Sequence, residues 1–380
     1  MGPRLERPKA FRLNMDNYAS ELNECLNRRN LPLDRFSDAV LVTIDRDLPT
    51  GWHHDSFDSK TKVAKDSGGF KLLMNPELSE TFDVKALIER HKNIGFGNQD
   101  IIISADFPIP TGQPLSAGEK ERRQVLSVDW FDTMRKEIPQ TIPALHGQNL
   151  DEILHHKGMY GVESEMVALG SNLAQTTPNV MGRLKNGKLK GKEVELTSRK
   201  DVWTRIFETL PALQTDVFLL GAGGMNAAPL AALIGAKAVD ATSWRLNARM
   251  FSIFNTVNGR YVKCGESKNN LMATKNQEFL AMRLQDEDYP FHGMRLKDLN
   301  RVFQSTGAKA TEVREIHNVW EMKKDSEVYN EFEGDPNGLA MLLEKRWRSS
   351  GWTDHQNIKR LKRAVDVAKS STRELELFIA

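Results

Sequence analysis

The chain has few cysteines, no long hydrophobic run and almost no net charge. Its 380 residues contain two cysteines, Cys25 and Cys264, which are too few for a disulfide framework and suit a reducing cytoplasm. No apolar run approaches the roughly 18 residues needed to cross a bilayer. The formal charge is +2 at pH 7, so any nucleic-acid binding must depend on local basic patches. We therefore expect a cytoplasmic globular protein of one large domain or two ordinary ones.

Short apolar runs alternate with helical patterns along most of the chain. Runs typical of buried strands lie at 40–44, 62–65, 100–105, 141–145, within 158–169, and at 217–220 and 236–239. Helical patterns lie at 16–29, 83–92, 116–137, 149–156, 201–210 and 226–234. Repeated strand–helix units favour an α/β fold, a (β/α)8 TIM-like barrel of roughly 250 residues. A doubly wound open sheet is the alternative.

The pattern changes in the second half of the chain and predicts three regions. Residues 1–37 form an N-terminal helical segment, and residues 38–262 form the catalytic barrel core. The core ends with a hairpin at 251–262, in which Asn258 and Gly259 supply the turn. Residues 263–380 are mostly helical, complete the barrel and contact nucleic acid.

An aspartate follows several of the predicted strands. Asp66, Asp106 and Asp240 hold this position, and His146 and Gly170 follow two further strands. The carboxyl ends of the strands are the face of a parallel barrel where chemistry is done. An aspartate after a strand is also a common helix cap, and the Gly-rich turn at 221–224 alone is weak evidence for phosphate binding.

Two segments are rich in lysine and arginine. The first contains Arg183, Lys185, Lys188, Lys190 and Lys192, and the second contains Lys345, Arg346, Arg348, Lys359, Arg360, Lys362 and Arg363. Tryptophan residues are interleaved with the second segment, and this mixture suits contact with a nucleic-acid backbone. The alternative is a solvated surface whose tryptophans are anchored in the core.

Three motifs in the same order resemble the tRNA-guanine transglycosylase superfamily. Residues 66–71, DSGGFK, resemble its DSGGFQ segment, with Lys71 where glutamine is usual. Residues 218–223, FLLGAG, resemble its YLMGVG strand and loop, and 239–249 resemble its FDCVLPTRNAR segment. The resemblance covers roughly residues 38 to 330. It implies a barrel enzyme that exchanges a guanine base in nucleic acid.

Departures from the family pattern concern the zinc and the substrate. The CxCxxC zinc motif is absent, so Cys264, His292 and His317 are left without the usual ligand set. We therefore expect no metal and no cofactor, and interpret the structural zinc as lost. Ser243 and Trp244 replace the Leu-Pro of the family, which is closer to its DNA-modifying branch, DpdA, of phages and bacterial gene clusters.

The resemblance implies a role for each site residue. Asp240 is the nucleophile, Asp66 the acid/base, and Asp106 the reader of the guanine donors. His146 stands where the family has a glutamine that hydrogen-bonds the base, and Arg249 holds a flanking phosphate. Further substrate contacts are expected from Ser67, Gly68, Gly69, Phe70, Gly170, Gly221 and Gly223.

The expected function is exchange of guanine in DNA for a free 7-deazaguanine, such as 7-cyano-7-deazaguanine. The target nucleotide must leave the duplex stack for its glycosidic bond to be reached. Three alternatives stay open: the same chemistry on tRNA, a catalytically silent nucleic-acid-binding barrel subunit, and an unrelated barrel that binds a small molecule. An oligomer is compatible with all of them.

Overall fold

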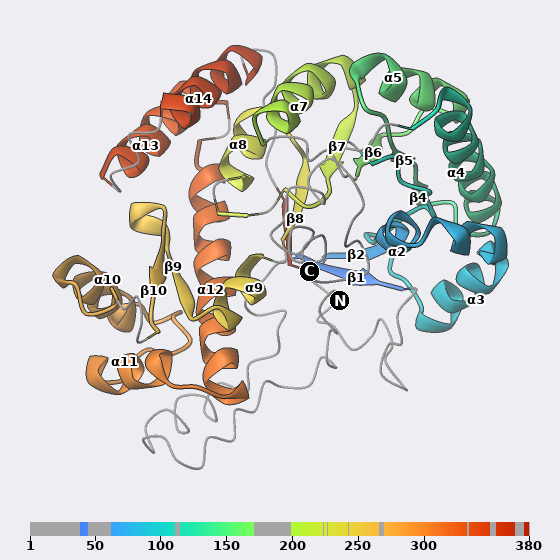
Figure 1. Ribbon diagram of the computed structural model, residues 1–380. Helices are drawn as coiled ribbons and strands as arrows, with labels where there is room; N and C mark the ends of the chain where they lie inside the picture. Colours follow the sequence, from blue (N-terminus) through green and yellow to red (C-terminus); the bar gives the residue numbers. More distant parts are fainter. Residues whose placement is uncertain are drawn as a thin grey trace.

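The fold of this computed structural model is mixed α/β, with short parallel strands surrounded by helices (Figure 1). The structure describes residues 39–44, 62–110, 115–170, 199–222, 224–225, 227–241, 243–265, 270–332, 334–349, 355–368 and 376–379. The predicted helix at 16–29 and the basic segment from Arg183 to Lys192 lie outside these residues.

The parallel sheet has nine strands in the order β4-β3-β2-β1-β11-β8-β7-β6-β5. They are β1 (Ala39–Thr43), β2 (Lys62–Asp66), β3 (Ile101–Ile103), β4 (Thr141–Ile142), β5 (Ala144–Leu145), β6 (Met166–Leu169), β7 (Asp216–Leu219), β8 (Ala238–Ala241) and β11 (Glu376–Ile379). β4 and β5, the two ends of this order, are separated in the chain by Pro143 alone. The Pro143 carbonyl accepts a hydrogen bond from the Ala168 amide at 2.9 Å, although proline itself has no N–H to donate.

Helices connect the strands and cover their outer side (Figure 1). They are α2 (Gly69–Met74), η3 (Pro76–Thr81), α3 (Val84–Ile94), α4 (Ala117–Glu137), α5 (Leu150–Met159), α7 (Arg199–Leu213) and α8 (Ala228–Leu233). Two of these helices begin with a side-chain cap: Asp83 accepts from the amides of Lys85 and Ala86 at 3.0 Å, and Ser116 accepts from the Glu119 amide at 3.2 Å.

A small apolar cluster lies on one side of the strands. It takes one buried residue from each of seven strands, Leu41, Ala64, Ile103, Ala144, Ala168, Phe218 and Ala238. Larger clusters lie between the strands and the surrounding helices, where side chains such as Trp130 and Phe131 on α4 are buried. Strand residues therefore alternate between an inner and an outer apolar layer, as expected for strands buried on both sides.

A second unit of the chain packs beside the sheet. It comprises α9 (Ser243–Arg249), the hairpin β9 (Ser252–Asn255) and β10 (Arg260–Lys263) around η5 (Thr256–Asn258), and the helices α10 (Thr274–Gln285), α11 (Leu296–Gln304) and α12 (Ala308–Asn330). The predicted hairpin and its turn are confirmed, since β9 and β10 pair antiparallel and Gly259 has a φ of 60°. The remaining helices are α13 (Pro336–Ser349) and α14 (His355–Ala368), and α14 contacts α7 and α8.

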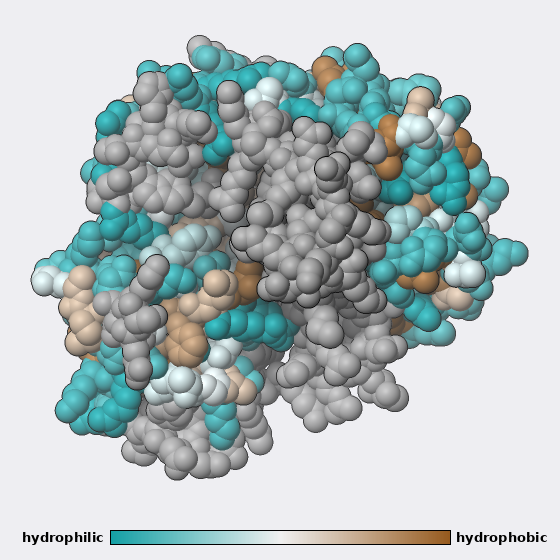
Figure 2. Space-filling view, in the orientation of Figure 1, coloured by the Kyte–Doolittle hydropathy of each residue, from teal (hydrophilic) through white to brown (hydrophobic). Residues whose placement is uncertain are grey.

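Hydrophobic residues on the face shown in Figure 2 form small separate groups between hydrophilic ones. Within the described residues, no helix is both long and apolar enough to cross a membrane.

Some predicted boundaries were wrong. The helix expected at 226–234 begins at Ala228, and the strand expected at 236–239 runs from Ala238 to Ala241, so Asp240 lies inside β8 and not after it. The C-terminal strand β11 was not predicted. It pairs in parallel with both β1 and β8.

Candidate active site

The predicted acidic residues and several glycines lie at the carboxyl ends of parallel strands. Asp66 is the last residue of β2, Asp106 follows β3, His146 follows β5, Gly170 follows β6, Gly221 follows β7, and Asp240 is in β8. Ligands of parallel α/β proteins bind outside this edge of the strands. The sheet therefore places residues that are far apart in sequence at a single edge.

Asp106 is hydrogen-bonded to the histidine that follows β5. His146 Nε2 lies 2.6 Å from Asp106 Oδ2, and the two side chains are 1% and 7% exposed. In the tautomer that carries its proton on Nε2, the imidazole donates to this carboxylate oxygen. Burial and the nearby Asp106 charge raise the pKa of Tyr160 well above its usual value. The Asp106–His146 pair is thus a polar contact in a largely apolar setting.

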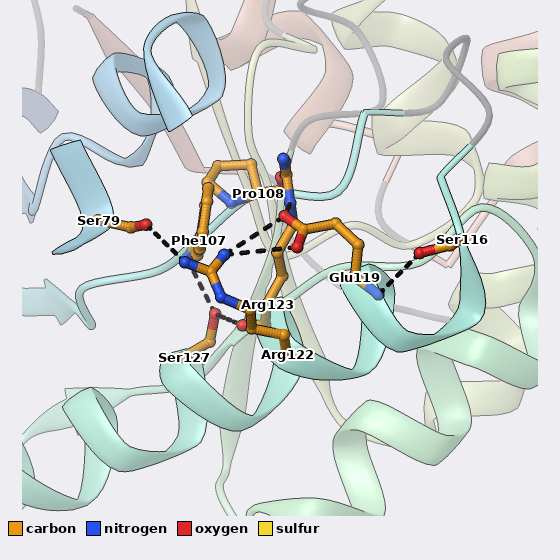
Figure 3. A network of polar contacts seen from close by, with 8 residues as sticks. All are labelled: Ser79, Phe107, Pro108, Ser116, Glu119, Arg122, Arg123 and Ser127. Carbon is orange, nitrogen blue, oxygen red and sulfur yellow. Dashed lines mark hydrogen bonds and ion pairs between the residues drawn. The ribbon is translucent and has the colours of Figure 1, made fainter. Parts of the chain in front are cut away.

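The segment after Asp106 is held by the long helix α4 (Figure 3). The Phe107 amide donates to Ser127 Oγ at 2.9 Å, and Arg123 Nη1 donates to the Pro108 carbonyl at 2.7 Å. The Arg123 guanidinium also lies 4.3 Å from the Phe107 ring centroid and is paired with Glu119 at 2.8 Å. These contacts fix the backbone next to Asp106, so the carboxylate projects from a rigid loop.

Glycines allow this pair to pack closely. A Cβ atom at Gly69 would lie 2.1 Å from Asp106 Oδ1, and one at Gly170 would lie 2.9 Å from His146 Cε1. Real Cβ atoms do not approach other atoms so closely, so both positions require glycine. The DSGGF motif and the end of β6 therefore contribute backbone surface to the Asp106–His146 pair.

Asp240 is buried beside the Gly-rich turn after β7. The Gly221 amide donates to Asp240 Oδ1, and Asp240 is 8% exposed. Burial raises the pKa of the Asp240 carboxyl to about 6, although the Gly221 amide acts to lower it. Gly221 has a φ of 76°, a conformation that favours glycine. Asp240 is thus ionised at neutral pH and poorly solvated, which suits a nucleophile.

Asp66 and Ser67 begin the DSGGF turn. Asp66 is half-buried, and its backbone carbonyl accepts a hydrogen bond from the Ile44 amide at 2.8 Å. Ser67 Oγ donates to the Ile103 carbonyl at 2.6 Å and is buried, so this hydroxyl joins β2 to β3. Gly68 has a φ of 87° and precedes α2. The side chain of Phe70, and Gly223, lie outside the described residues.

Close contacts link several of the site residues in one row. The row runs from Gly69 through Asp106, His146, Gly170 and Leu220 to Gly221 and Asp240. A separate cavity of about 250 Å³ lies between α2 and α3 and is lined by Gly68, Leu72, Phe82 and Arg90 among others. Asp106 and Asp240, the carboxylates of the row, are not among its lining residues, and neither is Asp66.

The basic residues of α13 and α14 divide into two groups. Arg346 is paired with Asp325 at 2.6 Å, Arg348 with Glu344 at 2.6 Å, and Arg363 with Glu208 at 2.9 Å. Lys345, Lys359 and Lys362 are exposed, and Arg360 is half-buried. Trp347 is buried, as the solvated-surface alternative predicts for this tryptophan. The exposed lysines and Arg348 and Arg363 are the part of this segment that a phosphate backbone could reach.

Arg249 ends α9 and does not contact the Asp106–His146 pair in the described contacts. Its Nε lies 3.8 Å from Glu315 Oε1, and its side chain is 57% exposed. A phosphate could therefore approach the guanidinium from solvent, in competition with Glu315.

Cys264 and His317, which the sequence analysis considered as zinc ligands, lie in a packed core. His317 Nε2 lies 2.8 Å from the Phe254 carbonyl, and Nδ1 lies 2.7 Å from the Tyr289 hydroxyl. Burial lowers the pKa of His317 to about 3 and raises that of Cys264 to about 12. Both ring nitrogens of His317 are thus engaged with protein groups, and a metal would have to displace one of these contacts. Across the described residues, no group of three potential ligands is brought together.

Two residues that support the site were missed from the sequence. The His146 amide donates to His156 Nδ1 at 3.0 Å, and Gln124 Nε2 donates to the His146 carbonyl at 3.2 Å. Burial lowers the pKa of His156 to about 3, so this ring stays neutral. Gln124 lies on α4 and His156 on α5, and no sequence pattern connected either residue with His146.

No protein-family model and no curated protein matches the chain.

Proposed function

We propose that the chain is a DNA-guanine transglycosylase, which replaces a guanine in DNA by a free 7-deazaguanine base. One observation carries the proposal: two buried carboxylates with different partners share one edge of parallel strands. Asp240 accepts from the Gly221 amide, and Asp106 accepts from His146. Base exchange needs such a division, because one carboxylate must bond to the sugar while others handle the base.

The proposed reaction is a double displacement at C1′ of the target nucleotide. The Asp240 carboxylate attacks C1′ as the C1′–N9 bond breaks, and the electron pair leaves with guanine. Asp66 gives its proton to the departing base, which leaves a covalent ester between Asp240 and the sugar. Asp66 then removes the N9 proton of the incoming base, which attacks C1′ and releases Asp240. Two inversions retain the configuration, as in retaining glycosidases.

Asp106 is proposed to read the base. Guanine and the 7-deazaguanines present two adjacent donors, N1–H and the 2-amino group, and an ionised carboxylate accepts both. The contact with His146, and the glycine at position 69, leave the Asp106 carboxylate little freedom to turn. A rigid acceptor gives base selectivity at a small entropic cost.

We further propose that the sheet closes into a (β/α)8 barrel. β3 pairs with β4 and β5 pairs with β6, while β4 and β5 flank a single proline. If β4 and β5 are counted as one strand, this strand pairs with β3 on one side and with β6 on the other, and the sheet has no free end. The apolar cluster with one residue from each of seven strands supports the same arrangement, because barrel interiors are filled in this way.

DNA is proposed as the substrate because the sequence resembles the DNA-modifying branch. The exposed Lys345, Lys359 and Lys362 supply cations for the backbone. The Asp240 site lies at strand ends, so the target nucleotide must leave the duplex stack.

The test is incubation of the full chain with labelled guanine and either duplex DNA or tRNA. Label in DNA is the expected result, and label only in tRNA would show that the substrate is tRNA and not DNA. A second assay offers 7-cyano-7-deazaguanine and detects its incorporation by mass spectrometry of the nucleosides. The proposed function would be overturned if neither polymer takes up labelled guanine and neither takes up this base. The Asp240→Ala variant should also lose the covalent protein–DNA band on a denaturing gel.

A further inference from the structure

His146 is held from three directions in addition to its contact with Asp106. Its amide donates to His156 Nδ1 at 3.0 Å, and its carbonyl accepts from Gln124 Nε2 at 3.2 Å. On the ring side, the backbone at Gly170 leaves no space for a Cβ atom, which would lie 2.9 Å from Cε1. The backbone of His146 is therefore fixed by two hydrogen bonds, the space around its ring is limited at Gly170, and Nε2 is directed at Asp106 Oδ2.

Because of this arrangement, His146 does not recognise a base directly through Nε2. That nitrogen is engaged with Asp106 at 2.6 Å, and the His146 side chain is 1% exposed. Asp106 is the more exposed member of the pair, at 7%. A ligand approaching the strand ends therefore meets the carboxylate, and His146 acts on the ligand through that carboxylate.

We propose that His146 is a positioning residue that sets the affinity and selectivity for the exchanged base by orienting the Asp106 carboxylate. The ligand class is a purine-like base with two adjacent donors, as in guanine and 7-deazaguanine. The inference rests on the proposed function, because it assigns the reading of the base to Asp106. A histidine that served packing alone would affect the fold and leave selectivity unchanged.

The experiment compares the wild type with His146→Ala, His146→Gln and His91→Gln. Exchange of DNA guanine is measured with labelled guanine and with hypoxanthine, which lacks the 2-amino donor, to give kcat and KM for each base. Glutamine keeps an N–H donor near the position of Nε2. His91 is a matched control, since it is also fully buried in the described structure, lies on α3 and has no hydrogen-bond partner for either ring nitrogen.

Loss of a charge-assisted hydrogen bond should raise the KM for guanine by about 10-fold or more in His146→Ala. The kcat at saturating base should change by less than about 2-fold, because His146 touches no reacting atom. Selectivity for guanine over hypoxanthine should fall by a similar factor of about 10, and His146→Gln should recover most of it. His91→Gln should leave the KM for guanine and the selectivity for guanine over hypoxanthine unchanged.

If His146→Ala is insoluble, Gly170→Ala gives the same test with the imidazole present, because the new methyl group must displace the ring. Unchanged selectivity in soluble His146→Ala, or in Gly170→Ala, would overturn the inference. A loss of selectivity that His146→Gln does not recover would also overturn it. These outcomes require a wild type that exchanges bases, so they differ from failure of the proposed function, in which the wild type itself incorporates neither base.

Discussion

Replacement of Asp240 by asparagine should abolish base exchange and at the same time stabilise the protein. The Asp240 carboxyl is 8% exposed, and burial raises its pKa from 3.8 to about 6. A rise of about two units corresponds to roughly 3 kcal/mol of unfavourable free energy for the ionised form in the folded state. Asparagine has nearly the same shape and no charge, and its Oδ1 can still accept from the Gly221 amide. The variant should therefore gain up to about 3 kcal/mol in the free energy of unfolding at pH 8.

The size of the stabilising effect depends on pH. The folded pKa lies above the unfolded value, so the folded state binds the proton more tightly. The contribution of Asp240 to stability is greatest below about pH 3.8 and falls as the pH rises to about 6. The difference between Asp240→Asn and the wild type should thus be largest at pH 8 and nearly absent at pH 4. An uncharged amide is a poor nucleophile, so the variant should form no covalent ester.

Urea unfolding followed by circular dichroism at several pH values measures the first effect, and labelled-guanine exchange measures the second. Two results would refute the reasoning. A stability gain that is equal at pH 4 and pH 8 would show that packing and not charge is responsible. Exchange at the wild-type rate would remove Asp240 from the mechanism.

Three further outcomes are expected. The kcat/KM of the wild type should fall below about pH 6, as Asp240 becomes protonated, and a flat profile from pH 5 to 8 would contradict this. Gly69→Ala should weaken base binding by about 10-fold or more, because its methyl group would meet the Asp106 carboxylate, whereas Gly118→Ala, which meets nothing within 4 Å, should not. A chelator should leave the Tm unchanged, since both ring nitrogens of His317 bond to protein groups, and a fall in Tm would indicate a bound metal.

Local sequence rules accounted for most of the elements. The helical patterns predicted at 83–92, 116–137 and 149–156 begin at Asp83, Ser116 and Asn149, and each of these residues caps its helix through a side-chain oxygen. The Asn258-Gly259 turn forms as expected, because glycine accepts the left-handed conformation that this turn needs. These features depend on neighbours within a few residues, so one sequence is sufficient to predict them.

Features that depend on distant residues were missed. β11 is a short strand at 376–379 that pairs with β1, more than three hundred positions earlier, and its four residues carry no signal for that partner. The Asp106–His146 contact joins residues 40 positions apart, and the aspartate motif did not indicate it. The raised pKa of Asp240 follows from burial, which the position of an aspartate in a sequence does not reveal.

The two buried carboxylates differ because the turns around them supply different partners. After β7, a Gly-rich turn brings a backbone amide to Asp240, and an amide neither gains nor loses a proton in the physiological range. After β5, the chain brings an imidazole to Asp106, and that imidazole is fixed by helices α4 and α5 through Gln124 and His156. The amide leaves Asp240 charged but weakly stabilised, as a nucleophile requires, whereas the imidazole restricts how Asp106 can turn, as recognition requires. One sheet edge thus provides two chemical environments for the same side chain, and the proposed exchange reaction needs both.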